Sequence, residues 1–429
     1  MKNHLIKNKL FFLLFIFPLT YIIGIAVVEV FLFIFLIFLF LFNHDKEFSN
    51  KKILIVLFLF SIYVGLNAFI QIPSNLKYSS IFHFRYLLFS IAVYFFFEKY
   101  SHIKFSKNLI LSIFSLTLII LFFDSFFQFF VGKNIFGQKL FAFRVSSFFG
   151  NDLILGSFLI RLLPIIFWYL FYLRIDINLN KFYSTIFFSI YFSVIYLSGE
   201  RTSFALLIGF ILLSIIFISE LRNILIKSTI IFSIFIISNA VLDLGKTNIT
   251  NRMFKKTYAQ VIKQNIISEN KIEYKENNFI KVIKSVNIFS KHHQGHLIVA
   301  KNLFKENLIF GVGPKGFRHF CRVVNYDPKE GVCSTHPHNI LAQTLSELGL
   351  IGLFFYFLFI IFLVSNVFII KDKKINKFEL NSFLIILIGI VIHLIPILPS
   401  GNFFNNWISS FIYFKIGLLL YSHKKIFVK

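Results

Sequence analysis

Long apolar runs are the feature that most constrains what this chain can fold into. About 20 apolar residues cross the hydrocarbon core of a bilayer as a helix. Of the 429 residues 57% are hydrophobic and only 15% charged, too few to cover a water-soluble fold. We therefore expect an all-α polytopic membrane protein and exclude a soluble enzyme, a disordered chain and a secreted disulfide scaffold. The runs predict about twelve transmembrane helices, at roughly 10–24, 27–43, 53–70, 82–97, 109–126, 153–173, 184–198, 203–219, 226–243, 347–370, 380–398 and 406–421.

The charge distribution predicts how these helices are oriented. The chain carries 44 Lys and Arg against 19 Asp and Glu, but the basic residues form no groove-sized cluster, which argues against nucleic-acid binding. With the N-terminus inside, the cytoplasmic segments hold about 20 Lys and Arg and the short outer loops about 5, as the positive-inside rule requires. We therefore expect both termini in the cytoplasm.

One long polar segment, 244–338, interrupts the apolar runs. In this orientation it is a periplasmic loop. Apolar residues at helical spacing in Phe279–Phe289 and Gly295–Phe310 predict amphipathic helices, which would lie on the membrane or over the bundle. The predicted organisation is an N-terminal bundle of about nine helices (1–243), the loop (244–338) and about three C-terminal helices (339–429).

The chain has two cysteines, Cys321 and Cys333, and both fall in this loop. An exported compartment permits disulfides, and closing a loop of about a dozen residues stabilises by roughly 3 kcal/mol. We expect a disulfide, with two free thiols as the alternative. A metal site is not expected, because no CxxC pattern or HExxH helix accompanies the cysteines.

The stretch 311–352, GVGPKGFRHFCRVVNYDPKEGVCSTHPHNILAQTLSELGLIG, is the richest in polar chemistry. Its His338 lies near the start of a helix at the membrane boundary and could act as a general base, or could merely cap the helix. Glu347 follows on the same helix, and we expect it to reach the membrane interior. Gly349 and Gly352 predict a face for close helix packing.

Arginines mark other span ends. Arg201 lies in a short outer turn, where it could bind pyrophosphate or pair with Glu200, and Arg144 lies just before the sixth span. Arg85 and Arg161 fall inside spans, where structural ion pairs with Asp124 and Asp152 are the simplest expectation. Lys415 is expected to snorkel or pair.

Arg144, Arg201, Arg318 and His338 share one predicted face of the membrane. Span ends on that face are where a lipid-linked anion presents its head group. The shared location therefore points to a site for a lipid pyrophosphate in the outer leaflet.

The sequence resembles the O-antigen ligase and polymerase superfamily. His338-Asn339, nine further residues and then Gly349-Leu350-Ile351-Gly352 fit the H[NSQ]-x9-G-x-x-[GTY] pattern of O-antigen ligases. The GERTSF turn and the RVSSFFGND segment resemble upstream motifs of the same superfamily. The resemblance implies a fold of the GT-C type.

The same resemblance implies a metal-independent, inverting glycosyltransferase without a cofactor. The donor would be a glycan on undecaprenyl pyrophosphate, and the acceptor a glycolipid or another lipid-linked glycan. His338 would be the catalytic base and Arg201 the catalytic cation, with Asn339 and Arg144 among the substrate-binding residues. The family commonly has a second arginine where this chain reads Lys291-His292-His293-Gln294-Gly295-His296. We expect a histidine, His293 or His296, or else Arg318 to take the role of that second arginine.

We predict an O-antigen ligase that acts on the lipid A core. A repeat-unit polymerase is the alternative within the family. A polysaccharide transporter or flippase would need repeated halves with broken helices near the midplane, and we find none. A peptidoglycan-type polymerase would need a catalytic carboxylate in the long loop, which has no convincing candidate.

Overall fold

The computed structural model describes residues 12–41, 51–73, 78–100, 107–175, 180–255, 257–258, 291–323, 333–369 and 375–427. These residues form helices, two isolated bridges (Lys133 with Lys139, Phe141 with Arg144) and no strand. The helices labelled α are α2 (Ile25–Leu41), α3 (Lys51–Gln71), α4 (Tyr78–Ile81), α5 (Phe84–Tyr100), α6 (Lys107–Val131), α7 (Leu155–Tyr172), α8 (Lys181–Leu197), α9 (Arg201–Phe217), α10 (Ser219–Leu242), α13 (Lys291–Glu306), α14 (Phe317–Val323), α15 (Ile340–Ile369), α16 (Lys377–Val391) and α17 (Asn406–Phe427). Shorter helical turns are η1 (Phe17–Ile22), η2 (Ser147–Phe149), η3 (Asn251–Lys255) and η5 (Ile392–Leu394).

The predicted all-helical membrane fold is confirmed, and each predicted apolar run coincides with a helix. Among the described residues six helices are long and apolar enough to cross a membrane: Lys51–Gln71, Asn108–Val131, Leu155–Tyr172, Ser219–Leu242, Ile340–Ser365 and Lys377–Leu394. Shorter apolar helices include Phe12–Ile22, Ile25–Phe40, Lys181–Leu197 and Arg201–Phe217. The chain is a multi-pass membrane protein, and a total of twelve crossings stays a prediction.

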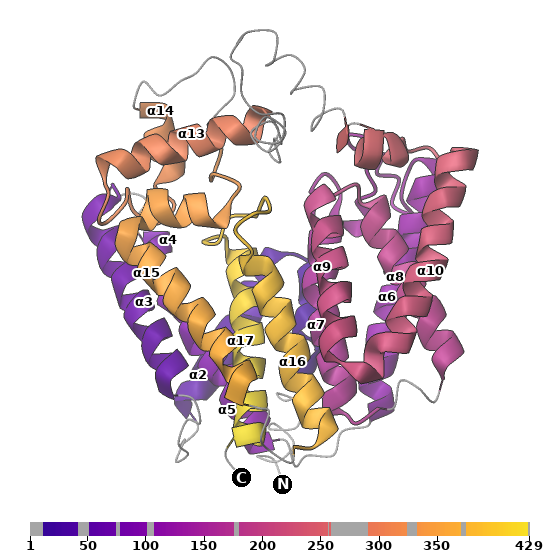
Figure 1. Cartoon of the computed structure of the whole chain (residues 1–429), viewed down its shortest axis with the longest axis horizontal. Coiled ribbons are helices and arrows are strands. Elements are labelled where there is room, and N and C mark those ends of the chain that lie inside the picture. The colour runs from indigo at the N-terminus through magenta and orange to yellow at the C-terminus, as the bar shows by residue number, and fades with distance from the viewer. Residues whose placement is uncertain are drawn as a thin grey trace, which may run out of the picture.

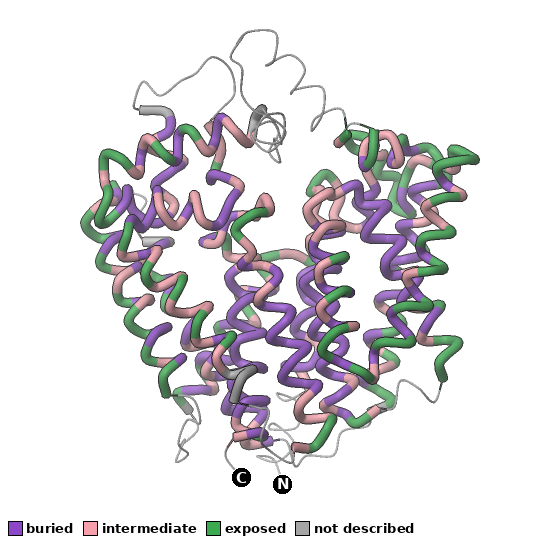
Figure 2. Tube along the Cα trace, in the orientation of Figure 1, coloured by how far each residue is buried: buried purple, intermediate pink, exposed green. Residues whose placement is uncertain are grey.

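The buried residues of the bundle are concentrated in its central helices. Figure 2 shows α7, α16 and α17 mostly buried, whereas α3, α6 and α10 carry many exposed positions. The exposed side chains of α10 include Ile230, Ile234 and Ile237, each more than half exposed. Isoleucines on an outer helix face need a hydrocarbon environment, so these faces are lipid-facing.

The C-terminal helices lie inside the bundle. α17 packs along α5, and α16 packs along α7, so one core extends from Leu14 to Ile426. At one crossing Gly389 lies so close to Pro164 that an added Cβ would meet the proline Cβ at 2.4 Å. The predicted three-part division of the chain therefore does not separate the hydrophobic core, and it stays a prediction.

α13 and α14 form a cap over the first turns of α15. They have a small core of their own, built from Val299, Ala300, Leu303, Val312, Phe317 and Cys321. Figure 1 shows this cap at the end of the bundle opposite to the C-terminal end of α17. The predicted helix at Gly295–Phe310 corresponds to α13, and the one predicted at Phe279–Phe289 lies outside the described residues.

α15 is kinked at Gly349, where φ is +64° and ψ −158°. The backbone of 308–313 runs against the kink: Leu350 N donates to Leu308 O (2.9 Å) and Gly313 N to Glu347 O (2.9 Å). The prediction of a helix-packing face at Gly349 and Gly352 was wrong for Gly349. This glycine lets a loop backbone approach, not a second helix.

The predicted partners of the intramembrane charges were also wrong. Arg85 pairs with Glu29 at 3.0 Å, whereas Asp124 accepts hydrogen bonds from Ile135 N (2.8 Å) and the Ser147 hydroxyl. Asp124 therefore orders the loop between α6 and α7 and is not the counterion of Arg161.

Candidate active site

Four histidines from two segments meet at the base of the cap. α13 supplies His293 and His296, and the segment before α15 supplies His336 and His338. The ring centroid of His338 lies 5.2 Å from those of His293 and His296 and 4.0 Å from that of His336. We call these four residues the histidine group. Among the described residues no three His, Cys, Asp or Glu side chains are arranged to hold a metal ion.

Backbone contacts fix the position of His338. It adopts the left-handed conformation (φ +56°), and its carbonyl accepts a hydrogen bond from Ser400 N at 2.8 Å. Asn339 caps α15 through Oδ1, which accepts from Ala342 N (2.9 Å), while its Nδ2 donates to Pro396 O (2.6 Å). Asn339 therefore positions His338, and its direct contact with substrate stays a prediction.

His336 lies beside His338 and is held in one tautomer. Its Nε2 lies 3.2 Å from Ser400 O, which can only accept, so Nε2 carries the proton. Its Nδ1 then accepts from the Thr335 hydroxyl at 2.9 Å. The contact with Ser400 binds the segment before α15 to the 395–405 loop.

Burial favours the neutral form of His336 and His338. It lowers the pKa of His338 to about 4, and the neighbouring His293 and His296 lower it further in the same direction. The pKa of His336 falls to about 3, mainly by burial and then through the charge of His338. At neutral pH the His338 ring therefore has a nitrogen lone pair that can accept a proton.

These shifts predict a pH dependence of stability. The unfolded histidines take up protons below about pH 6.5, whereas folded His338 does so only near pH 4. The stability difference is fully present above pH 6.5 and is lost as the pH falls through about 4. We expect the melting temperature to fall over this window, and to fall less steeply in His338→Asn. Parallel curves for the two proteins would contradict the shift.

A second polar group lies at the N-terminal end of α9. The Arg144 side chain donates to Ser198 O (2.9 Å) and Leu153 O (3.1 Å) and lies 3.6 Å from the Glu200 carboxylate. Glu200 also accepts from Gly156 N at 2.9 Å. Burial raises the pKa of Glu200, although the charge of Arg144 opposes this shift. The carboxylate thus holds the two loops that carry the arginines together.

Arg252 is a functional candidate that the sequence reasoning missed. It lies in η3, at the start of the long loop, and its Nε donates to Gly199 O at 3.0 Å. Its charge acts on both Arg144 and Arg201. Arg144, Arg201 and Arg252, which we call the arginine group, therefore gather three cations around one turn. Only the fold brings Arg252 there, because 50 positions separate it from the GERTSF motif.

Glu347 does not reach the membrane interior as we expected. It is fully buried at the cap, where its carboxylate accepts from Phe317 N (3.2 Å) and Gln343 Nε2 (2.8 Å). It thereby holds the loop that carries Lys315 and Arg318. Burial and the nearby charge of Arg318 lower the pKa of Lys315 to about 8. Arg318 also acts electrostatically on His336, which places it beside the histidine group.

Cys321 and Cys333 form a disulfide, with an S–S distance of 2.03 Å. It ties α14 to the segment that leads to His336. We expect reduction to lower the melting temperature by several degrees, because a loop of this size contributes about 3 kcal/mol. The check is a thermal melt with and without reductant. The double variant Cys321→Ser, Cys333→Ser serves as a control that reductant should leave unchanged, and an unaltered wild-type melt would contradict the prediction.

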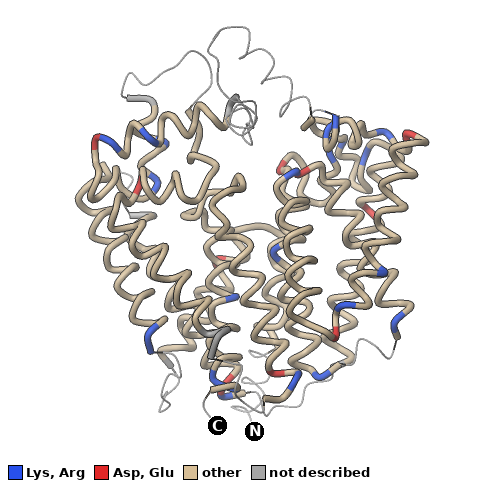
Figure 3. Tube along the Cα trace, in the orientation of Figure 1, with Lys and Arg blue, Asp and Glu red and all other residues tan. Residues whose placement is uncertain are grey.

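The two groups lie at the same end of the molecule but on different sides. The cap with the histidine group stands over the start of α15, and the arginine group lies at the N-terminal end of α9 (Figure 1). Figure 3 shows charged residues mainly at the two ends of the bundle, with few between them. The structure thus brings His293, His296 and His338 together, and separately Arg144 with the turn that carries Arg201.

Residues 186–357, less than half of the chain, match the family described as O-antigen ligase. This part of the chain is similar to O-antigen ligases, and we call it the O-antigen ligase segment. The match begins in α8 and ends inside α15, so the segment contains Arg201, Arg252, the histidine group and Arg318. A comparison with curated proteins gives no match.

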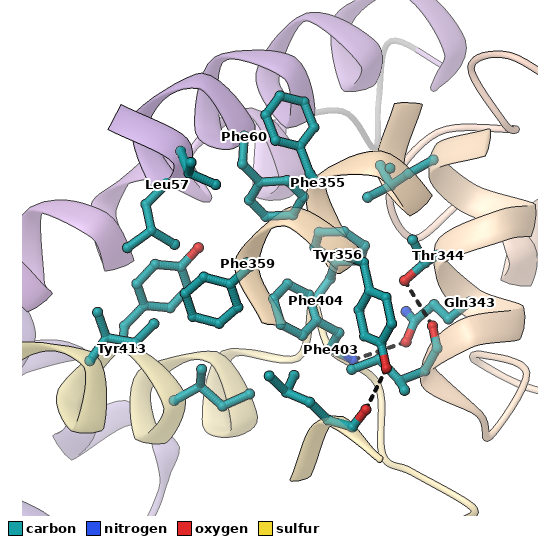
Figure 4. A pocket seen from close by; sticks show the side chains of 17 residues that line it. Leu57, Phe60, Gln343, Thr344, Phe355, Tyr356, Phe359, Phe403, Phe404 and Tyr413 are labelled. Carbon is teal, nitrogen blue, oxygen red and sulfur yellow. Dashed lines mark hydrogen bonds between the residues drawn. The ribbon is translucent and has the colours of Figure 1, made fainter. Parts of the chain in front are cut away.

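An apolar pocket lies next to the segment that carries His338. Figure 4 shows Phe60, Phe355, Tyr356 and Phe404 facing into it. At its polar edge Gln343 Oε1 accepts from Phe403 N at 3.0 Å. Its lining is mostly aromatic and aliphatic, and none of the four histidines lines it.

Proposed function

We propose that the protein transfers a glycan from undecaprenyl pyrophosphate to an acceptor sugar hydroxyl, as an O-antigen ligase acting on the lipid A core. The reaction takes place on the periplasmic face of the inner membrane, with both termini in the cytoplasm. The observation that carries the proposal is the shared end of the bundle: the histidine group and three clustered arginines lie there, within or beside the O-antigen ligase segment.

His338 is the proposed base. Its free imidazole nitrogen takes the proton of the acceptor hydroxyl while that oxygen bonds to the anomeric carbon from the face opposite the pyrophosphate. The bond from that carbon to the pyrophosphate oxygen breaks, which inverts the configuration. A pKa near 4 makes His338 a weak base when the site is empty. The negative donor pyrophosphate raises that pKa when it binds nearby, so the base strengthens once the donor is present.

The arginine group is the proposed binding site of the pyrophosphate. The leaving group gains negative charge as the glycosidic bond breaks, and guanidinium groups stabilise such charge through paired hydrogen bonds. Arg201 is the central residue, with Arg144 and Arg252 beside it, while Arg318, His293 and His296 line the acceptor side. Three cations supply the charge that this step needs, so the proposal assigns no metal or cofactor.

Reconstitution tests the proposed function. The purified protein in liposomes is given a defined glycan on undecaprenyl pyrophosphate with either lipid A core or a second lipid-linked glycan. Product on the core supports the ligase. Product only on the lipid-linked glycan would show a polymerase instead of a ligase. No product with either acceptor overturns the proposal.

Arg201→Gln should lower transfer by about 10²-fold or more, because one donor to a developing anion is commonly worth that much. Arg222→Gln is the matched control: Arg222 is an exposed arginine of α10 that donates to Ile215 O at 3.1 Å, away from the site. We expect the control to keep the wild-type rate. Equal rates for the wild type, Arg201→Gln and Arg222→Gln would exclude a catalytic role of Arg201.

A further inference from the structure

Arg161 is a buried cation that the proposed mechanism does not use. It lies inside α7 with only 6% of its surface exposed. Its guanidinium bonds to Ser157, including the backbone oxygen at 2.9 Å, and its carbon lies 5.2 Å from the centre of the Trp407 ring. Among the described residues its Nε has no hydrogen-bond partner and no carboxylate lies within 4.0 Å, so the charge of Glu200 acts on it only from a distance.

Other nitrogen atoms surround Arg161. Lys415 of α17 is completely buried, donates to Gly389 O at 2.7 Å and lies 3.5 Å from Nδ1 of His393. His393 Nδ1 also lies 2.9 Å from Gly389 O, which can only accept, so Nδ1 carries a proton and Nε2 of the neutral ring is an acceptor. In the described part of the chain, His393 Nε2 and Trp407 Nε1 are buried without a hydrogen-bond partner. Two donors, Arg161 Nε and Trp407 Nε1, are therefore unsatisfied, and His393 Nε2 becomes a third donor when a bound anion favours the protonated ring.

Within the described residues this arrangement lacks a negatively charged partner in contact with it. A lysine or a histidine can lose its proton when buried, but an arginine stays charged. A contact with an aromatic ring stabilises a cation modestly and leaves the charge in place. Each unsatisfied buried donor adds a further cost in free energy. An anion bound there would remove both costs.

The position of this region is as informative as its composition. Ser157, which binds Arg161, follows Gly156, which donates to Glu200 in the turn that holds the arginine group. Trp407 and His393 flank the 395–405 loop, whose Ser400 N donates to His338 O. The region is therefore connected through adjacent residues to both groups of the candidate active site. All four of its residues lie outside residues 186–357, so the family match does not describe it.

We propose that Arg161, His393, Lys415 and Trp407 form a second anion site, which binds a phosphate or pyrophosphate group. Phosphate oxygens accept several hydrogen bonds, and they carry the negative charge that would balance the basic groups. The group could belong to a lipid head group or to a free ion. Its identification with the carrier pyrophosphate of the reaction rests on the proposed function, whereas anion binding itself does not.

Trp407 provides the readout, because the chain has only two tryptophans. In a Trp168→Phe background Trp407 is the sole indole. The protein in nanodiscs is titrated with inorganic pyrophosphate and, separately, with farnesyl pyrophosphate. We expect a saturable change in Trp407 fluorescence, with affinity at least 10-fold weaker in Arg161→Gln and unchanged in Arg222→Gln. Lys415→Met, also expected to weaken binding, replaces Arg161→Gln if that variant does not insert.

The outcomes separate the alternatives. Binding of both probes supports a site for the phosphate group itself, and binding of farnesyl pyrophosphate alone supports a lipid-borne group. No signal with either probe, or equal affinity in wild type, Arg161→Gln and Lys415→Met, overturns the proposal. If the titrations show binding while the reconstituted protein transfers no glycan, the anion site is supported and only the proposed function is contradicted.

Discussion

His338→Ala is expected to lower glycan transfer by about 10²- to 10⁴-fold while the protein inserts and melts normally. Removing a general base typically costs this much, because the acceptor hydroxyl keeps its proton as it attacks. Little change in folding is expected, because the hydrogen bond at this position uses the backbone: Ser400 N donates to the His338 carbonyl. The measurement is the initial rate of transfer in proteoliposomes, normalised to folded protein.

Two further variants make this result decisive. His338 has φ +56°, a conformation that asparagine tolerates better than alanine does, so His338→Asn removes the base with less backbone strain. His319→Ala removes a histidine of α14 that lies outside the histidine group. We expect His338→Asn to be as inactive as His338→Ala, and His319→Ala to be active. Transfer near the wild-type rate in His338→Asn would exclude His338 as the base.

The helices were predictable because burial in lipid leaves a simple mark on the sequence. A span needs a long apolar run, so every predicted run coincides with a helix even where the ends differ. The run predicted to start at 347 belongs to α15, which begins at Ile340. Its first turns carry polar residues such as Gln343, which face the cap and the 395–405 loop instead of lipid.

The pairings within the site were less predictable, because they depend on tertiary contacts. Spacing alone places Arg201 in a turn but cannot place Arg252 against Gly199. Proximity along the chain suggested a carboxylate for Arg161, yet the fold gives the nearby carboxylate of Asp124 to the backbone of a loop. The family pattern includes Gly349, but a short motif does not state which backbone approaches it.

Gly349→Ala is the second large effect that we expect, this time on stability and on activity together. The backbone at Gly349 (φ +64°, ψ −158°) is a conformation essentially confined to glycine. An added Cβ would also lie 2.3 Å from Ile309 O and 2.7 Å from Gly311 N, which are backbone atoms and cannot rotate away. The loop 308–313 would have to leave the kink. Since Glu347 holds that loop and the histidine group lies beside the cap, we expect transfer to be lost and the melting temperature to fall sharply.

Gly209→Ala is the matched control for this substitution. Gly209 lies within α9, where an added Cβ would meet no atom within 4 Å, and alanine is the better helix former by about 1 kcal/mol. We expect that variant to melt at or slightly above the wild-type temperature and to transfer glycan normally. A thermal melt followed by size-exclusion chromatography, with the transfer rate of each variant, measures both effects. If Gly349→Ala behaved like Gly209→Ala, the kink would not be needed to hold the cap over His338, and the histidine group would have to be positioned by the 395–405 loop alone.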